Sequence, residues 1–403
     1  MALETGVAKR LTFKEETSWG VAAGSAGAQR MRRVTSSFEL KKDTYQSGEI
    51  RSDYQVSDFR HGVRSVVGSI SGELSAKTYG NMFEALLRRD FATVTALTAL
   101  SVTISGSGPT YTVARAAGDF LTGGVKVGDV VRLSVGTFNA ANINKNLVVT
   151  AVTALNFTCY PMNGVAMVAE GPIASGTLSW VGKKTFVPVT GHTDLSFSIE
   201  QFYATVAQSE LFVGCKVNSA DVELPSTGMA KASFSLLGKD VVTGTAEYFT
   251  SPTAETTTTV VSAVSGRVFV AGAPVAIITD AKLSIVGGQT PGPALGTNSV
   301  VNIFPGKVAV TGTLSVYFQD ATYRNLFINE TEASIILILA DGETATADFV
   351  SFVLPRVKMG SNSKSDGEQA IIESLSFQAL LNTAGGTGIQ TEKTTLSMQD
   401  SQM

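Results

Sequence analysis

A segment with the pattern of a strand followed by a helix occurs twice in this chain. Gly62–Phe83 (GVRSVVGSISGELSAKTYGNMF) aligns without a gap on Gly306–Phe327 (GKVAVTGTLSVYFQDATYRNLF). Eight positions are identical, among them Gly68/Gly312, Tyr79/Tyr323 and Phe83/Phe327. A register shared across strand, turn and helix is typical of a structural duplication. We therefore expect one scaffold built twice from a single chain.

Both copies have the same physical pattern. In the first copy Val66, Gly68 and Ile70 alternate with Ser69 and Ser71, as in a strand with one buried face. Helical spacing of apolar residues follows, and the threonine before it is a predicted N-cap in each copy. These threonines are Thr78 and Thr322.

The bulk properties indicate a folded, multidomain chain. Its 403 residues exceed one ordinary core, so two or three domains are expected. Hydrophobic residues make up 44% and charged residues only 16%, which favours packed cores over disorder and suggests that further surface is buried against partners. A net charge of −3 gives no overall basic field for tight nucleic-acid binding.

The cysteines and the apolar runs bear on the compartment. Cys159 and Cys215 are the only cysteines and fall in different predicted domains, so a disulfide is not expected. The first residues lack the apolar core of a signal peptide, and the apolar run Ile335–Ala340 is too short to span a bilayer. We expect a soluble protein that is made in a cytoplasm and does not contact a membrane.

The repeat and the changes in residue composition along the chain predict a domain order. Short strands separated by Gly, Pro and Asn turns fill the segment after the first helix, which indicates a small β-domain inserted into the first copy. A short helix is predicted at Thr205–Phe212. The first 33 residues and the last 22 are expected to become ordered only against partners. The predicted divisions are 1–95 (first copy), 96–182 (inserted domain), 183–250 (first copy, continued), 251–265 (linker), 266–382 (second copy) and 383–403 (tail).

A long polar loop precedes the first repeat, at Asp43–His61. Hairpin loops usually have two to five residues, so a loop of this length is expected to have a function. Mixed charges with aromatic residues suit a protein contact, although a plain surface loop remains the alternative. The candidate contact residues are Tyr45, Glu49, Arg51, Asp53, Tyr54, Asp58, Phe59 and Arg60. The counterpart loop of the second copy, Gly287–Pro305, carries no charge, so the two loops are expected to meet different surroundings.

Motifs for chemistry are not found in the sequence. His61 and His192 have no metal-ligand spacing around them, and no nucleophile elbow or phosphate-binding glycine loop is present. Carboxylates are scattered rather than paired in a recognisable pattern. We predict no catalytic site, no cofactor and no metal.

Several stretches resemble one known family, the major tail tube proteins of long-tailed bacteriophages. FELKKDTYQSGEIRSDYQVSDFRHGVRSVVGSISGELS is similar to the strand, long loop and strand that open the family's fold. GCKVNSADVELPSTGMAKASFSLLG is similar to its central hairpin, and DFVSFVLPRVKMG with FQALLNTAGG to its closing strands. The resemblance covers the scaffold on both sides of the insert.

The resemblance implies a mainly β fold: a β-sandwich or barrel-like scaffold with short flanking helices, here duplicated and carrying an inserted β-domain. It also implies a subunit that forms rings edge to edge, with rings stacked into a hollow tube that conducts DNA. The loop at residues 43–61 would reach the neighbouring ring, and the insert would lie outside the tube. Because each chain holds two copies, a ring of three chains with pseudo-sixfold symmetry is favoured over a hexamer.

The same resemblance implies partners within a virion tail: further copies of the chain, the tape-measure protein, and the tail terminator and tail-tip proteins. DNA would pass through the lumen without specific binding. Two other readings stay open from the sequence. One is a secreted or surface adhesion or carbohydrate-binding protein with the insert as its binding module, and the other is a β-sandwich hydrolase. The first lacks an export signal and the second an acid/base constellation.

Overall fold

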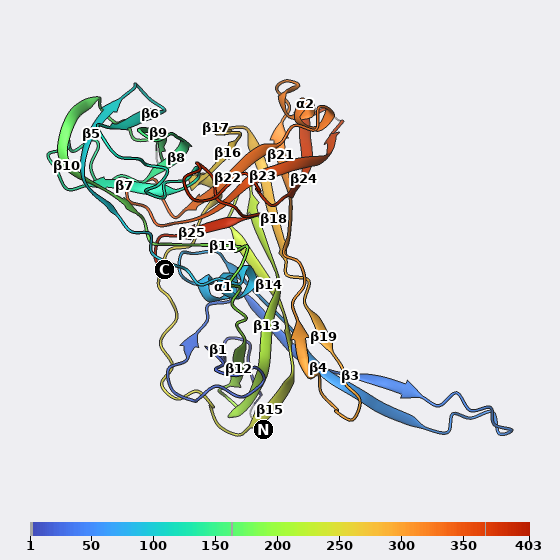
Figure 1. Ribbon diagram of the computed structural model, residues 1–403. Coiled ribbons are helices and arrows are strands. Elements are labelled where there is room, and N and C mark those ends of the chain that lie inside the picture. The colour runs from blue at the N-terminus through green and yellow to red at the C-terminus, as the bar shows by residue number, and fades with distance from the viewer. Residues whose placement is uncertain (1–2, 163, 367) are drawn as a thin grey trace.

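The computed structural model describes residues 3–162, 164–366 and 368–403 and is mainly β, as predicted. Figure 1 shows an elongated scaffold of long strands, a small barrel at one end and a hairpin arm that projects from the other. Long strands form because hydrophobic residues alternate with Ser, Thr and charged residues along them. In β14, for example, buried Ala232, Phe234 and Leu236 alternate with half-buried Ser233 and Ser235.

The first half of the scaffold consists of nine strands and one helix in the described residues. They are β1 (Lys9–Glu15), β2 (Gln29–Arg30), β3 (Thr35–Gln46), β4 (Phe59–Glu73), α1 (Gly80–Leu87), β11 (Lys183–Phe186), β12 (Phe197–Tyr203), β13 (Gln208–Pro225), β14 (Lys231–Gly238) and β15 (Asp240–Gly244). The barrel strands interrupt this half between α1 and β11.

The second half has its own set of elements. They are the 3-10 turn η1 (Ala263–Ser265), β16 (Gly266–Val270), β17 (Ala273–Pro274), β18 (Ile278–Val286), β19 (Thr290–Gly292), β20 (Asn302–Phe304), β21 (Ala309–Tyr317), α2 (Thr322–Ile328), β22 (Ala333–Ala340), β23 (Phe349–Lys364), β24 (Ile372–Ala379) and β25 (Ser397–Asp400).

Strand pairing shows that the two halves have the same topology. In the first half β3 pairs with β4, β4 with β14, β14 with β13, and β13 with both β12 and β15. In the second half β18 pairs with β21, β21 with β24, β24 with β23, and β23 with both β22 and β25. Even the irregularities recur: β13 shifts register between Val217 and Ser219, and β23 between Met359 and Ser361. The duplicated scaffold predicted from the sequence is therefore present.

The halves are joined as neighbours in one sheet. β13 pairs antiparallel with β18, from Ser219 opposite Val286 to Pro225 opposite Asp280. One sheet thus runs β3-β4-β14-β13-β18-β21-β24-β23 across both halves. Its apolar face, with Ile70, Phe234 and Leu314, forms a continuous core beneath α1. Burial of this face, at about 25 cal/mol per Å² of apolar surface, is the main favourable term for the fold.

The inserted segment folds as a closed six-stranded barrel. Its strands are β5 (Leu97–Ser105), β6 (Tyr111–Arg115), β7 (Val130–Ser134), β8 (Leu147–Val152), β9 (Asn156–Pro161) and β10 (Glu170–Trp180), in the order β10-β5-β6-β9-β8-β7. A separate core fills it, with Phe120 edge-on to Phe157 at 5.0 Å between ring centres. The chain enters and leaves side by side, because Ala92 and Lys184 exchange backbone hydrogen bonds of 2.8 and 2.9 Å.

The barrel of the first half covers the outer sheet of the second half. Val130 and Val148 of the barrel pack with Ile336, Phe349 and Val353 of the second half. The equivalent surface of the first half, around Leu211, is covered instead by Ala23, Ala28 and Phe249. The two copies thus bury the same outer face with different segments.

Several local predictions were wrong. Thr205–Phe212 is not a helix: after a turn the chain enters β13, because Leu211, Phe212 and Val213 are needed in the sheet. Thr78 does not cap α1, since the Thr78 hydroxyl contacts Ser75 and Thr256, and the N-cap position falls on Tyr79. Thr322 lies inside α2 as its first residue.

The chain termini also differ from expectation. The N-terminal segment is not an arm that waits for a partner, because β1 pairs with β12 and buries Leu11 and Phe13. The last residues are not a loose tail, because β25 pairs with β11 and β23 and buries Met398. Both segments complete the sandwich of a half whose other strands lie far away in sequence. The loop 287–305 likewise contains its own small hairpin, β19–β20.

Candidate assembly surfaces

The loop predicted as a contact forms the tip of a long projecting arm. β3 and β4 continue past the body of the sheet, so the turn itself spans only residues 47–58 (Figure 1). The structure brings the eight predicted residues together on this arm: Tyr45 is the penultimate residue of β3, Phe59 and Arg60 begin β4, and the other five lie in the turn. All eight are exposed, and the Tyr54 side chain reaches 99% exposure. An exposed aromatic arm is typical of a surface that binds protein.

The charges of the arm are organised in local pairs. Arg51 contacts Asp53 at 2.8 Å and Arg60 contacts Asp58 at 2.7 Å, while the Ser57 hydroxyl donates to Glu49 over 3.2 Å. The Arg51 hydrogen bond lowers the pKa of Asp53 below its ordinary value. Exposed pairs of this kind contribute little to stability, so they shape the arm rather than hold the fold together.

The corresponding loop of the second half is folded back. The Arg64 backbone amide donates to Asn298 over 3.0 Å, and Val300 and Ile303 are buried. The β19–β20 hairpin therefore supports the base of the β3–β4 arm instead of projecting. This difference explains why one loop is charged and the other is not.

One face of the shared sheet is lined with hydroxyl groups; we call it the hydroxyl face. It lies opposite the core and α1, and a groove of about 650 Å³ crosses it. Cross-strand hydrogen bonds join its serines, and the bond from Ser219 to Ser235 recurs in the second half from Ser361 to Ser376, each at 2.7 Å. Its members are Thr35, Ser37, Ser69, Ser71, Ser219, Ser233, Ser235, Ser284, Thr311, Thr313, Ser315, Ser361, Ser363, Ser374 and Ser376.

The charges on the hydroxyl face are of both signs. Lys282 pairs with Glu223 at 3.0 Å and Lys41 with Glu39 at 3.3 Å. Further charged residues on this face are Glu73, Asp221, Lys231, Asp280 and Lys358. Because Lys41 and Lys282 each pair with a glutamate, neither presents an unpaired positive charge on this face. It is a polar surface on which positive and negative charges nearly balance.

The residues shared by the two copies have different surroundings. Gly68 lies under the Phe38 ring and Gly312 under the Phe377 ring, where an added Cβ would come within 2.2 Å and 2.4 Å of ring carbons. Tyr79 is buried, and its hydroxyl donates a hydrogen bond to the Arg32 backbone carbonyl over 3.1 Å. Burial raises the pKa of Tyr79 to about 12. Tyr323, its counterpart, is only half-buried.

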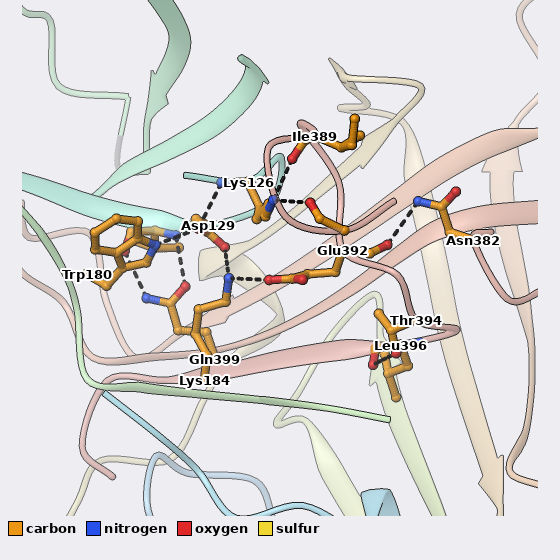
Figure 2. Close-up of polar contacts among 12 residues, drawn as sticks. Lys126, Asp129, Trp180, Lys184, Asn382, Ile389, Glu392, Thr394, Leu396 and Gln399 are labelled. Atoms are coloured by element: carbon orange, nitrogen blue, oxygen red, sulfur yellow. Dashed lines mark hydrogen bonds and ion pairs between the residues drawn. The ribbon is translucent and has the colours of Figure 1, made fainter. Parts of the chain in front are cut away.

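A buried polar network fixes the barrel to the scaffold, and sequence reasoning did not find it (Figure 2). Asp129 of the barrel contacts Lys184, accepts from the Trp180 indole over 2.5 Å and accepts from the Lys126 backbone amide over 3.1 Å. The Gln399 amide of β25 bridges Val130 and Val181. Burial lowers the pKa of Lys126, whose ammonium group donates to two backbone carbonyls of the segment 386–389. These contacts hold the barrel firmly in place.

The structure offers little for other functions. In the ranges it describes, no group of three or more His, Cys, Asp or Glu side chains could hold a metal ion. Likewise, none of the described helices has the length and apolarity needed to cross a membrane. Cys159 and Cys215 are buried in separate cores, and burial raises the pKa of both thiols.

The fold and these surfaces define a class: a β structural subunit with a duplicated scaffold, a projecting arm and a polar sheet face. The family model described as phage tail tube protein matches residues 6–379, and the chain belongs to this family. It is therefore a structural component of a phage tail, and its family assembles into a tube with other tail components. A comparison with curated proteins gives no match.

Proposed function

We propose that copies of this chain close into rings, that the rings stack into a hollow tube, and that the tube conducts DNA during infection. The shared sheet carries the proposal, because it has one face for a core, one polar face for a channel and two free ends for neighbours. Pairing those ends around a ring removes edge strands that would otherwise promote aggregation. Stacking of identical rings is an interface that repeats without closing and gives a filament.

The hydroxyl face is assigned to the lumen. Serine and threonine remain hydrated and carry no charge, so they offer DNA phosphates no counterion-releasing contact. Paired lysines such as Lys282 are already neutralised by a carboxylate. A channel of this kind lets DNA pass without holding it. The barrel packs on the opposite side of the scaffold and lies outside the tube.

The arm is assigned to contacts between rings. Its turn at residues 47–58 is exposed and projects beyond the sheet that forms the body (Figure 1). The loop of the other half is folded back and cannot make the same reach. A ring therefore presents one arm per chain to its neighbour.

The duplication sets the number of chains. Two equivalent halves per chain let three chains supply six similar sectors, so we favour a trimeric ring with pseudo-sixfold symmetry over a hexamer. The tape-measure protein would occupy the lumen before DNA, and the tail terminator and tail-tip proteins would bind the two ends. The protein is made in the host cytoplasm and functions in the virion.

Electron microscopy of the purified protein tests the proposal. We expect rings of uniform outer diameter, or tubes with a regular axial repeat. A monomer that persists at high protein concentration and in the presence of tail-tip complexes would contradict it. Because tube growth in such systems can need an initiator, the tail-tip complex belongs in the experiment.

A further inference from the structure

The shared sheet ends in two strands that lack an outer neighbour. In the described part of the chain β3 pairs only with β4, and residues 359–364 of β23 pair only with β24. Both edges are long, and their side chains on the hydroxyl face are polar or charged. An unpaired edge presents a row of free amide and carbonyl groups that can bind another strand.

The joint inside the chain shows what such an edge binds. β13 is the counterpart of β23, and its segment Ser219–Pro225 is paired with β18. β18 is in turn the counterpart of β3, because each lies shortly before the repeated strand of its half and pairs antiparallel with it. The chain thus contains one complete joint, between β13 and β18. The two free edges, β23 and β3, are the counterparts of the two strands of that joint.

The correspondence is exact enough to transfer a register. Gly68 and Gly312 align, and the pairings around them place Ser361 where Ser219 lies and Lys41 where Val286 lies. Ser219 is opposite Val286 in the internal joint. The transferred register therefore sets Ser361 opposite Lys41 of the next chain.

The helices give an independent observation at the same place. Phe83 of α1 is 1% exposed because it lies between Phe234 of its own half and Phe352 of the other half, at 5.1 and 5.6 Å between ring centres. Its counterpart Phe327 of α2 is 39% exposed, and Ile328 beside it is also exposed. α2 has the same sequence pattern as α1 but lacks the following half that would cover it.

We propose that the β23 edge and α2 of one chain bind the β3 edge of the next chain and reproduce the β13–β18 joint between chains. The strands pair antiparallel, with Ser363 opposite Glu39 and Ser361 opposite Lys41 of the neighbour. Small hydroxyl side chains then face charged ones on the hydroxyl face, without like charges in opposition. This inference rests on the proposed ring and specifies which edges close it.

Cysteine pairs test the register in the full-length protein. Directly opposite residues have Cβ atoms about 4.5–5.5 Å apart, near disulfide range, whereas diagonal neighbours are about 7–8 Å apart. Under mild oxidation, Ser363→Cys with Glu39→Cys should link chains at least several-fold more than the diagonal control, Ser361→Cys with Glu39→Cys. The native cysteines are buried, so the background is low. Non-reducing gels measure the linked species, and microscopy of the same samples shows whether rings are present.

The possible results separate the joint from the ring itself. Rings whose opposite pair links strongly support the joint. Rings in which neither pair links, or in which the diagonal pair links better, overturn the joint and leave the ring intact. Unassembled protein without links overturns both.

A second variant tests the helix without touching the strands. Phe327→Ser exposes no core because this side chain is already partly in solvent, so the subunit should fold normally. Assembly should then need at least several-fold more protein, as measured by sedimentation. Leu155→Ser, at a barrel residue that is 45% exposed against 39% for Phe327, is the matched control and should assemble like the natural chain. Equal assembly of both variants would contradict the role of α2.

Discussion

At the scale of single residues, the scaffold depends on positions where the available space or a buried charge restricts which side chain can be accommodated. The repeated glycines are required because an aromatic ring lies where a side chain would be. Buried Asp129 is stabilised by a lysine, an indole and a backbone amide. In each case at least one of these neighbours comes from a different strand.

Gly312→Ala should destabilise the subunit by about 1–3 kcal/mol. The added Cβ would come within 2.3 Å of the Lys282 carbonyl oxygen, a backbone atom that cannot move without breaking the sheet. Urea unfolding measures the change. Gly342→Ala is the matched control, since nothing lies within 4 Å of its Cβ position. A loss at Gly312 no larger than at Gly342 would refute the steric argument.

Asp400 should make stability depend on pH. Burial raises the pKa of this carboxyl to about 6 from an ordinary 3.8, although the Lys77 and Gln402 amides donate to it. A raised folded-state pKa means that its stabilising contribution is full below the unfolded pKa and is lost as pH rises through the folded value. Relative to Asp400→Asn, the natural chain should lose about 1–3 kcal/mol of unfolding free energy between about pH 4 and about pH 7.

Urea unfolding of both proteins across this pH range gives the difference directly. Comparison of the two chains cancels the other titrating groups. A difference that stays constant or grows with pH would show that the Asp400 carboxyl is not the source.

At the scale of elements, the same strand and loop serve different purposes in the two halves. β3 and β4 extend into a free arm, whereas β19 and β20 fold against β4. α1 is buried between the halves, whereas α2 lies open. The repeated elements therefore differ in what covers them and not in how they fold.

Deletion of residues 48–57 should abolish stacking without unfolding the subunit. The deleted turn buries none of its side chains, so the thermal midpoint should change by only a few degrees. Microscopy should show single rings instead of tubes. A Gly/Ser segment of the same length in this place separates the chemistry of the arm from its reach, and it should also fail to stack if the side chains make the contact. Normal tubes from the deletion would remove the arm from the inter-ring contact.

At the scale of the whole molecule, one chain contains two halves of the same topology that are covered by different segments. The shared sheet crosses both halves, and the barrel of one half covers the outer face of the other. This arrangement links the halves into one unit, because neither half has a complete surface alone.

The mass of the isolated ring should be three times the 42.2 kDa of one chain. Native mass spectrometry measures it, and averaged micrographs should show three protruding barrels around a ring of six similar sectors. The physical reason is that each chain supplies two equivalent sectors of the sheet. A mass of six chains would instead support the hexamer and double the number of sectors.

The sequence alone determined the repeat, the strand pattern and the exposed loop. These features depend on neighbours close in sequence: alternation in 66–74, the barrel strands between turns, and a run of charges with aromatics at 45–60. Local propensity and periodicity are enough for such features. Local prediction went wrong at residues 205–212, where pairing with β12 on one side and β15 on the other places residues 208–212 in a sheet instead of a helix.

Only the tertiary structure decided which segments complete each half and which edges stay free. β1 and β25 look like loose ends because their partners, β12 and β23, lie far away in sequence. The Asp129–Lys184 pair joins the residue before β7 of the barrel to β11 of the scaffold, and no spacing in the sequence marks it. Pairing across such distances is set by the competition of all strands for the same core. The identical Phe83 and Phe327 acquire different exposure for that reason: the second half covers Phe83, and among the residues that the structure describes nothing equivalent covers Phe327.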